Sequence, residues 1–543
     1  MRITHKILAI CSAILTLAAC QSKEGPIEPG KGITSFCFLM ENNPSLTEDV
    51  ICTVNDDGTI IGAINDRLSS YKLIATFELD ADGVTVNKAV QKSGLSKNDF
   101  SKDVVYEIQL HDGTVKTQTV KMTVKPAPQV PIVRITTQNS AQILDKKNYI
   151  KGTVVIEDPA GMYWDTPRIE LQMSKDKHGI RGRGNTTWDM PKKPYKLKFD
   201  EKVSIFGLGE DKEWVLLANY ADKTLLRNVV AMKLSEIVGM PWTPAMLPVE
   251  VYLNGEYLGC YTFSEHKKVS EHRVNLNIVD ESANSGVEIT GDYYMEIEQN
   301  QDETTCFYTE VCGIPMMFSD PEVPTDAQLQ YVKGYFKEAE TALRSSNFKD
   351  PATGWQKYID IETFAKAYLV NELVKNIDGN MRKSSFITKK QNDKFQMYHL
   401  WDYDLALGNC NYLDDEFGAT DGPEGWFIKD YTWARYSPVG KHHQWFTILT
   451  KDPAFCSKVK QIWNENYAQL SNIPNFIDEM AAYINDAQKR NFQKWNILYT
   501  YVWPNVFESG SYEQHVGYLK NYYSTRFNWL NSRFNVAEGQ IFQ

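Results

Sequence analysis

The stretch IRGRGNTTWDMPKKPYKLKFD, residues 180–200, concentrates positive charge in a chain that is acidic as a whole. Eight lysines and arginines but only two aspartates lie between positions 175 and 198, whereas the formal net charge of the chain is −11. Backbone N–H groups in a glycine-containing turn, with arginines beside them, can form a nest that binds anions. The stretch therefore predicts an anion site in which Arg181 and Arg183 take part.

The segment PYKLKF that follows the turn predicts a strand with Lys196 and Lys198 on the same face, because side chains alternate along a strand. Two inward-facing lysines are costly without an anionic partner. Two kinds of partner fit the pattern. One is the phosphate chain of a nucleotide, by analogy with the glycine-rich loop and strand lysine of kinases. The other is a set of aspartates and glutamates elsewhere in the chain that pair with a solvated basic face.

Two acidic motifs follow about 180 and 200 residues later. Asp378 lies in NIDGN (376–380), which we expect at the end of a helix, and LWDYDLALGN (400–409) contains Asp402 and Asp404. If this second segment is extended, its two aspartates share one face among apolar neighbours. Buried carboxylates that close repel each other unless a cation lies between them, and their oxygens suit magnesium or manganese. Alternatively, Asp404 caps a helix that starts at Leu405 and Asp402 pairs with an arginine.

Glu265 occupies a third position of interest. It ends the predicted hairpin VEVYLNGEYLGCYTFSEH, whose Asn-Gly turn is a strong hairpin signal. In a kinase the hinge between the lobes would fall there, so its carboxylate is a candidate for contacting adenine or ribose. The other interpretation is a residue at the rim of the site.

The N-terminus predicts export. Arg2 and Lys6 precede an apolar run that ends in Leu-Ala-Ala-Cys at Cys20, so residues 1–19 are typical of a signal peptide. The ending resembles a bacterial lipobox, which implies lipidation of Cys20 and anchoring in a lipid membrane. An ordinary signal peptide with an incidental cysteine is the alternative. We expect residues 20–30 to be a flexible tether.

The rest of the chain divides by composition. Residues 31–125 are predicted to be all-β, and an immunoglobulin-like sandwich fits their length and hairpin pattern. KPAPQVP at 125–131 reads as a stiff linker. Residues 132–540 mix strands and helices, with helices expected over 223–238, from Ile361 to Gly379 and near the C-terminus. The fold class expected is therefore α+β.

Composition excludes several classes of protein. The acidic balance argues against nucleic acid as a partner, which needs a basic face. No Cys-x-x-Cys or HExxH motif occurs, so zinc ribbons, thioredoxin-type redox sites and zincins are not supported. Cys306 and Cys312 either form a disulfide or remain buried thiols.

Four segments together closely resemble the CotH kinase family: IRGRGNTTWDMPKKPYKLKF, LLANYADKTLLRN, VEVYLNGEYLGCYTFSEH and WDYDLALGN. The resemblance runs in order over about residues 132–535. It implies an atypical, two-lobed protein-kinase-like domain that transfers the γ-phosphate of ATP to Ser or Thr of protein substrates, with magnesium or manganese. The N-terminal features resemble the Gram-negative lipoproteins of the family, which implies an outer-membrane location facing the periplasm or the cell surface.

The resemblance also implies roles for individual residues. Lys198 or Lys196 would hold the phosphates, Asp378 would be the catalytic-loop acid, and Asp402 with Asp404 would bind the metal. One departure concerns the second metal ligand, because Lys-Ser-Ser stands at 383–385 where a kinase offers asparagine. Asn376 is the candidate substitute. The alternatives to a kinase are a weakly active or inactive member that serves in surface binding or adhesion, and a carbohydrate-active or other hydrolase.

Overall fold

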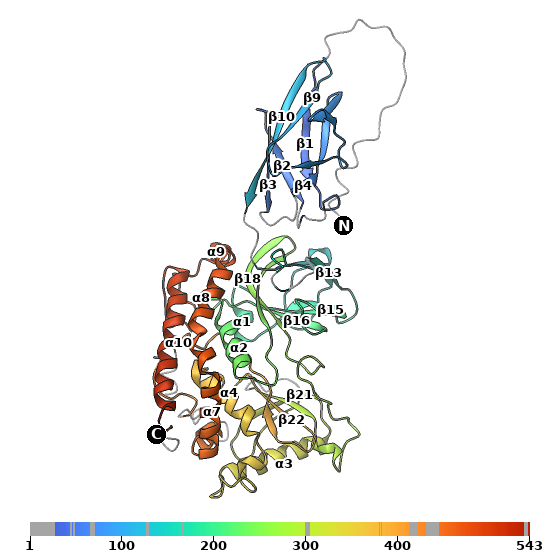
Figure 1. The fold of residues 1–543 in the computed structure, drawn as a ribbon. Coiled ribbons are helices and arrows are strands. Elements are labelled where there is room, and N and C mark those ends of the chain that lie inside the picture. The colour runs from blue at the N-terminus through green and yellow to red at the C-terminus, as the bar shows by residue number, and fades with distance from the viewer. Residues whose placement is uncertain are drawn as a thin grey trace. The chain divides into compact units, whose positions relative to one another are not determined.

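The computed structural model describes residues 28–43, 46, 49–65, 71–125, 130–161, 163, 168–298, 305–379, 381, 383–411, 422–429, 445–536 and 541–542. The predicted signal peptide, Cys20 and most of the predicted tether lie outside these residues. The chain divides into two compact units, residues 1–127 and 128–543 (Figure 1). The division falls inside the proline-rich segment at 125–131, and each unit is described by itself.

The first unit is all-β. An eight-stranded sheet has the order β5-β1-β2-β3-β10-β9-β6-β7, and β4 pairs with β8. Strands β9 and β10 pair antiparallel on either side of the turn at Asp112-Gly113, in agreement with the hairpin pattern of residues 31–125, whereas β10 and β3 run parallel. The immunoglobulin-like topology stays a prediction. The strands are β1 (Gly32–Phe38), β2 (Val50–Val54), β3 (Thr59–Asn65), β4 (Lys72–Ile74), β5 (Thr76–Asp80), β6 (Gly83–Val86), β7 (Ala89–Val90), β8 (Lys97–Asp99), β9 (Val104–Gln109) and β10 (Val115–Lys125).

The second unit begins with another eight-stranded sheet, in the order β13-β12-β11-β17-β18-β16-β15-β14. The predicted hairpin β17–β18 is confirmed. Its turn residues Asn254 and Gly255 both have positive φ, 51° and 86°, as the two-residue turn of a tight hairpin requires. The elements are β11 (Ile132–Thr137), β12 (Gly152–Glu157), β13 (Arg168–Met173), β14 (Gly179–Gly182), α1 (Thr186–Asp189), β15 (Tyr195–Val203), β16 (Asp211–Leu217), α2 (Arg227–Ile237), β17 (Met246–Leu253) and β18 (Glu256–Glu265).

A five-stranded sheet of order β20-β21-β19-β22-β23 and a group of helices complete the unit. Helix α10 packs on α4, α7 and α8, and Figure 1 shows these long helices gathered on one side of the unit. The mixed content confirms the α+β class, while the two-lobed kinase-like arrangement stays a prediction. The elements are β19 (Tyr293–Ile297), β20 (Cys306–Tyr308), β21 (Pro315–Asp320), α3 (Asp326–Leu343), α4 (Ile361–Val374), β22 (Ser385–Lys389), β23 (Phe395–Met397), α6 (Trp445–Leu449), α7 (Pro453–Ser471), α8 (Ile473–Tyr483), α9 (Asn485–Lys494) and α10 (Tyr512–Phe534).

Helix α4 ends earlier than its sequence pattern indicates. The expected stop was Gly379, but the helix ends at Val374 and Lys375 takes the left-handed conformation with φ of 47°. The Lys375 ammonium group donates to the carbonyls of Gly422 and Glu424, so long-range contacts hold a conformation that lysine rarely adopts. Gly379 has a different function, since a Cβ there would lie 1.9 Å from Asn371 Oδ1.

No helix in the described part of the chain is both long and apolar enough to cross a membrane. Cys312 is a buried free thiol, so the disulfide considered between Cys306 and Cys312 is absent.

A buried ion pair joins helices α4 and α10. The side chains of Glu372 and Arg526 are both fully buried, and the guanidinium donates to the carboxylate and to the backbone carbonyl of Glu372. Arg526 also donates to the carbonyls of Pro423 and Gly425. The carboxylate accepts from backbone N–H groups in the same segment, those of Phe427 and Lys429. The pair therefore fixes segment 422–429 onto both helices.

Replacing Arg526 by leucine should destabilise the second unit by about 3–5 kcal/mol, because it leaves the carboxylate of Glu372 buried without its charge partner. Urea denaturation of the full chain, followed by tryptophan fluorescence, measures the loss. The matched control is Lys520→Leu, also on α10, which removes an ion pair to Asp478 whose side chains are 37% and 53% exposed. Exposed pairs contribute only about 0–1 kcal/mol, so equal losses in the two variants would contradict the assignment.

Candidate active site

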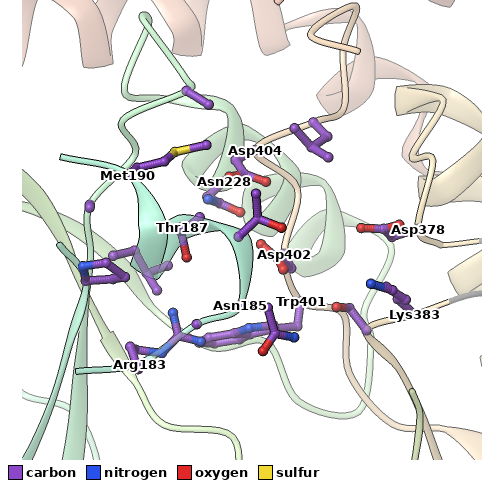
Figure 2. A pocket seen from close by; sticks show the side chains of 18 of the residues that line it. Arg183, Asn185, Thr187, Met190, Asn228, Asp378, Lys383, Trp401, Asp402 and Asp404 are labelled. Carbon is purple, nitrogen blue, oxygen red and sulfur yellow. The ribbon is translucent and has the colours of Figure 1, made fainter. Parts of the chain in front are cut away.

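A cavity of about 390 Å³ lies in the second unit, where segments distant in sequence converge. Its walls come from the turn at 183–187, the end of β16, the start of α2, strand β19, and the segments around 378–384, 401–405 and 503–504. Figure 2 shows the side chains that point into it. The cavity combines five carboxylates with several cations: Glu296, Glu298, Asp378, Asp402 and Asp404 face Lys146, Arg183, Lys267 and Lys383.

The structure brings four of the sequence-predicted site residues into this cavity: Arg183, Asp378, Asp402 and Asp404. Asp402 lies between Asp404 and Asp378 in Figure 2, and the guanidinium of Arg183 lies 5.7 Å from the centre of the Trp401 ring. These residues come from a turn after β14, a loop after α4 and a loop after β23. Folding thus gathers the first motif and the two acidic motifs at one place.

The two strand lysines lie elsewhere. Lys196 and Lys198 do share a face of β15, but both reach Glu213 on the neighbouring strand β16, at 2.7 and 3.3 Å. Neither is among the described residues that line the cavity. Burial opposes the charge of Glu213, yet the nearby lysines lower the pKa of its carboxyl to about 2. The anionic partner of this lysine pair is therefore a glutamate of the same sheet.

Three further predicted residues support the surroundings of the cavity rather than its lining. Arg181 donates to the backbone carbonyl of Lys146 and lies over the Tyr149 ring. Glu265, only 4% exposed, accepts from the backbone N–H of Ala245 at 3.1 Å. Asn376 is buried and, through Oδ1, accepts from the backbone N–H of Asp378 at 3.3 Å.

Burial disfavours the ionised form of both loop aspartates. The carboxylate of Asp402 faces the open cavity, yet protein surrounds it so closely that loss of bulk water raises its pKa, an effect that Arg183 and the lysines partly oppose. Burial raises the pKa of Asp404 well above its ordinary value, and the negative charges of Asp402, Asp222 and Asp378 raise it further. A proton or a cation therefore binds favourably here.

The oxygen donors fit a divalent cation that is completed by another ligand. Among the described residues, no cluster of three or more His, Cys, Asp or Glu side chains is arranged to hold a metal by itself. Magnesium commonly binds through one or two carboxylates plus substrate phosphates rather than in a cage made only of protein. Asp402 and Asp404 supply such a carboxylate pair, and burial raises the pKa of both carboxyl groups, a cost of ionisation that a bound cation would offset.

The loop that carries these aspartates does not have the expected extended conformation. Asp402 has φ of 71°, in the left-handed region that aspartate tolerates better than most residues. Tyr403 holds the turn through its backbone and its side chain. Its N–H donates to Asn228 Oδ1 at 2.7 Å, and its hydroxyl donates to Asn371 Oδ1 at 2.9 Å. Turns occupy residues 404–405 and 407–408, so no helix begins at Leu405.

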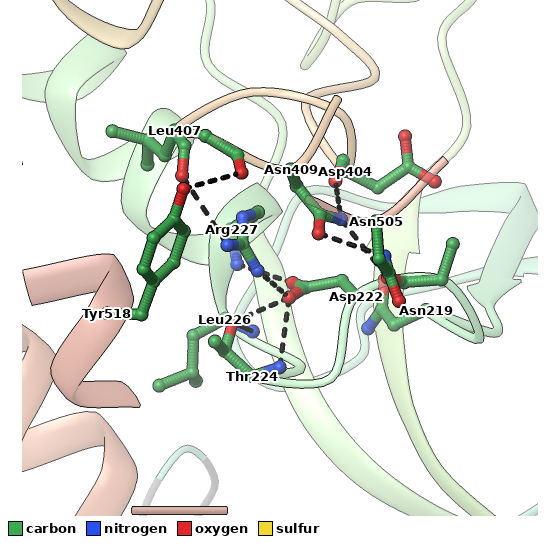
Figure 3. A network of polar contacts seen from close by, with 12 residues as sticks. Asn219, Asp222, Thr224, Leu226, Arg227, Asp404, Leu407, Asn409, Asn505 and Tyr518 are labelled. Carbon is green, nitrogen blue, oxygen red and sulfur yellow. Dashed lines mark hydrogen bonds and ion pairs between the residues drawn. The ribbon is translucent and has the colours of Figure 1, made fainter. Parts of the chain in front are cut away.

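A buried network around Arg227 holds the rest of the loop (Figure 3). The guanidinium pairs with Asp222 at 2.6 Å and donates to the carbonyls of Ala406 and Leu407. Nearby, Asn409 donates to the carbonyl of Asp404 at 2.8 Å. The start of α2 thereby sets the position of the loop on which Asp404 lies.

Asn371 connects the two acidic loops. Its Oδ1 accepts from the Tyr403 hydroxyl and from Asn376 Nδ2, at 2.9 and 3.2 Å. Gly379 leaves the space that this side chain occupies. The loop of Asp378 and the loop of Asp402 are therefore joined through one buried amide.

Sequence reasoning missed an ion pair that lines the cavity. Lys267, just after β18, pairs with Glu296 on β19, and its ammonium group lies 4.5 Å from the centre of the Phe386 ring. One signal was available, because Glu296 interrupts the apolar strand YYMEI, and a charged residue in a buried strand needs a partner. Lys383 and Lys146 carried no comparable signal.

Comparison with known proteins identifies a family that matches most of the second unit. A model of the family described as CotH kinase protein matches residues 180–530, which is more than half of the chain. The matched range contains all five carboxylates of the cavity. No curated protein matches the chain.

Replacing Asp404 by asparagine should raise the melting temperature of metal-free protein at pH 8, and the gain should shrink as the pH approaches 4. Because the folded-state pKa is raised, the folded protein retains a proton that the unfolded chain, with a pKa of about 3.9, releases. Raising the pH above that value therefore destabilises the wild type until its folded pKa is passed, and asparagine does not titrate.

Thermal melts in EDTA between pH 4 and 8 measure this difference, with Asp478→Asn as the control because Asp478 is an exposed aspartate on α8. An Asp404→Asn profile parallel to that of the wild type would refute the raised pKa of Asp404.

Proposed function

The chain belongs to the CotH kinase protein family, and we propose that it transfers the γ-phosphate of ATP to a Ser or Thr hydroxyl of a protein, with magnesium or manganese. The observation that carries this proposal is the cavity itself, which Asp378, Asp402 and Asp404 line together with Arg183 and Lys267. Phosphoryl transfer needs positioning and charge stabilisation more than covalent chemistry. A cavity lined by both acids and cations provides both.

The cations would bind the phosphates. Arg183 and the turn at 184–187 offer a guanidinium group and backbone N–H groups, and Lys267 offers an ammonium group that Glu296 orients. A lysine paired with a glutamate next to the phosphates is also what protein kinases use. Here the pair comes from the end of β18 and from β19, not from Lys196 or Lys198.

The acids would divide into two roles. Asp402 and Asp404 would hold the divalent cation, which neutralises charge on the phosphates when it is bound. Asp378 would accept a hydrogen bond from the acceptor hydroxyl and orient its oxygen toward the γ-phosphorus. The new bond joins that oxygen to phosphorus, the bond to ADP breaks, and the hydroxyl proton leaves through Asp378 to solvent. Lys383, beside Asp378, lies where it can stabilise a transferred phosphoryl group.

We propose further that Cys20 is lipidated and anchors the protein in the outer membrane, facing the periplasm or the cell surface. The support is the sequence of residues 1–20 alone. A second candidate function, binding or adhesion without catalysis, is favoured by one observation. Lys383 stands where a kinase offers a second metal-binding asparagine, and Asn376 is buried behind the cavity as a support of the Asp378 loop.

Replacing Lys267 by methionine should weaken the binding of Mn–ATP by about 10- to 100-fold, the effect of losing a charged hydrogen bond of about 1.5–3 kcal/mol. Lys198→Met is the matched control, because it removes a strand lysine and leaves Glu213 paired with Lys196. ATP at a hundredfold excess over Kd should stabilise the wild type and this control alike by about 2.7 kcal/mol. The melting temperature of both proteins should rise accordingly.

Thermal-shift titrations with Mn–ATP give the three Kd values. The melting temperature without ligand shows whether Lys267→Met remains folded. A loss of affinity in Lys198→Met but not in Lys267→Met would reverse the assignment.

The acids can be separated by their different roles. Asp402→Asn should weaken Mn–ATP binding and abolish phosphotransfer, because it removes charge from the cation site. Asp378→Asn should bind Mn–ATP like the wild type while phosphotransfer falls by about 10²–10⁴-fold, the usual cost of losing a general base. Labelled ATP and autophosphorylation of the full chain report the rate. Unaltered Mn–ATP binding by Asp402→Asn would exclude it as a metal ligand, and no labelling of the wild type would favour the binding function.

A further inference from the structure

An exposed group of apolar side chains borders the cavity. Tyr499, Tyr501, Trp503 and Val506 are 76%, 46%, 48% and 37% exposed, and together they are called the aromatic rim. Single exposed apolar side chains are normal. Here, however, four lie within eight residues, whereas the rest of the second unit's described residues have only five large apolar side chains that are exposed. A concentration of this kind marks an interaction surface.

The backbone of the aromatic rim is fixed by buried polar groups. Lys223, only 2% exposed, donates to the carbonyls of Leu498 and Thr500. Burial lowers the pKa of its ammonium group, so placing a lysine here is unfavourable unless the contacts offset it. Asn505 donates to the carbonyl of Ala221 at 2.7 Å. The aromatic side chains are therefore presented on a backbone that is already ordered, which reduces the entropy lost on binding.

The aromatic rim lies at the acidic end of the cavity. Trp503 and the adjacent Pro504 line the cavity themselves. Asn505 donates to Asn409 Oδ1 at 3.0 Å, and Asn409 in turn donates to the carbonyl of Asp404 (Figure 3). A chain bound along the rim would therefore continue directly toward the aspartates that we assign to the phosphoryl transfer.

We propose that the aromatic rim docks the acceptor protein, and that it selects a segment with a leucine, isoleucine or phenylalanine close to the phosphorylated Ser or Thr. The inference rests on the proposed function and names its substrate class. Exposed Tyr and Trp side chains on an ordered backbone are the residues that dominate binding energy at protein interfaces. The four rim side chains carry no charge, so they complement apolar rather than charged flanking residues. A nucleotide base is too small to cover all four rim side chains, which favours a protein segment as the bound group.

The test uses an array of peptides with one central Ser or Thr in a Gly-Ala background. One flanking position at a time carries Leu, Phe, Lys or Glu. The full chain with Mn–ATP should phosphorylate peptides with Leu or Phe at one position about tenfold faster than those with Glu, a preference worth about 1.4 kcal/mol. Tyr499→Ala should remove this preference without changing the Kd for Mn–ATP, because Tyr499 is 76% exposed and is not among the described residues that line the cavity. The matched control is Tyr467→Ala on α7, a tyrosine that is 42% exposed, which should keep the preference.

The possible results separate the two proposals. A preference for charged flanks, or an apolar preference that survives in Trp503→Ala and Tyr499→Ala, overturns the docking inference. So does a weaker Kd for Mn–ATP in Tyr499→Ala, which would assign the rim to the nucleotide. If no peptide is labelled although Mn–ATP binds, the proposed transfer fails. The docking inference is then decided by whether the same peptides, immobilised, retain the full chain. Retention on Leu and Phe peptides that is lost in Trp503→Ala supports it, and equal retention on all peptides overturns it.

Discussion

The guanidinium group of Arg227 is the contact on which the arrangement of the cavity depends. It is buried at the start of α2, is neutralised by Asp222, and donates to two carbonyls of the loop that follows Asp404. A buried arginine whose donors are used in this way fixes direction as well as distance, because its donors are planar and rigid. The start of α2 and the loop after Asp404, about 180 residues apart in the sequence, are thereby held in fixed relative positions. The position of Asp404 follows from helix packing and not from its own short loop.

This fixed arrangement is needed because the cavity places like charges together. Burial raises the pKa of Asp402 and Asp404, and the charge of Asp378 raises that of Asp404 further. Arg183, Lys267 and Lys383 oppose the shift at Asp402, and Arg227 opposes it at Asp404. Such a group of charges persists only when surrounding structure holds it, as buried side chains of Tyr403 and Asn371 do here. Preorganised sites of this kind usually reduce the stability of the protein around them.

Short sequence motifs predicted the local elements and several residues of the site. They did not predict every group with which those residues interact. The hairpin at Asn254-Gly255 and the three aspartates of the cavity could be predicted, because turn chemistry and clustered carboxylates are local signals. Alternation showed that Lys196 and Lys198 share a face, yet it cannot tell which group that face meets, and the partner was Glu213. Lys267 and Glu296 meet only through sheet packing. The end of α4 at Val374 depends on carbonyls almost fifty residues away.

Gly379 has a consequence for how such chains diverge. The hydrogen atom at its α-carbon leaves room for an amide that ties two acid-bearing loops together. One codon change to any larger residue would push Asn371 out of both contacts at once, while every aspartate of the cavity stayed in the sequence. A descendant could therefore abandon the chemistry with its acidic signature intact. Inventories of aspartates alone would then count inactive descendants as enzymes, and the residue to inspect first is a glycine.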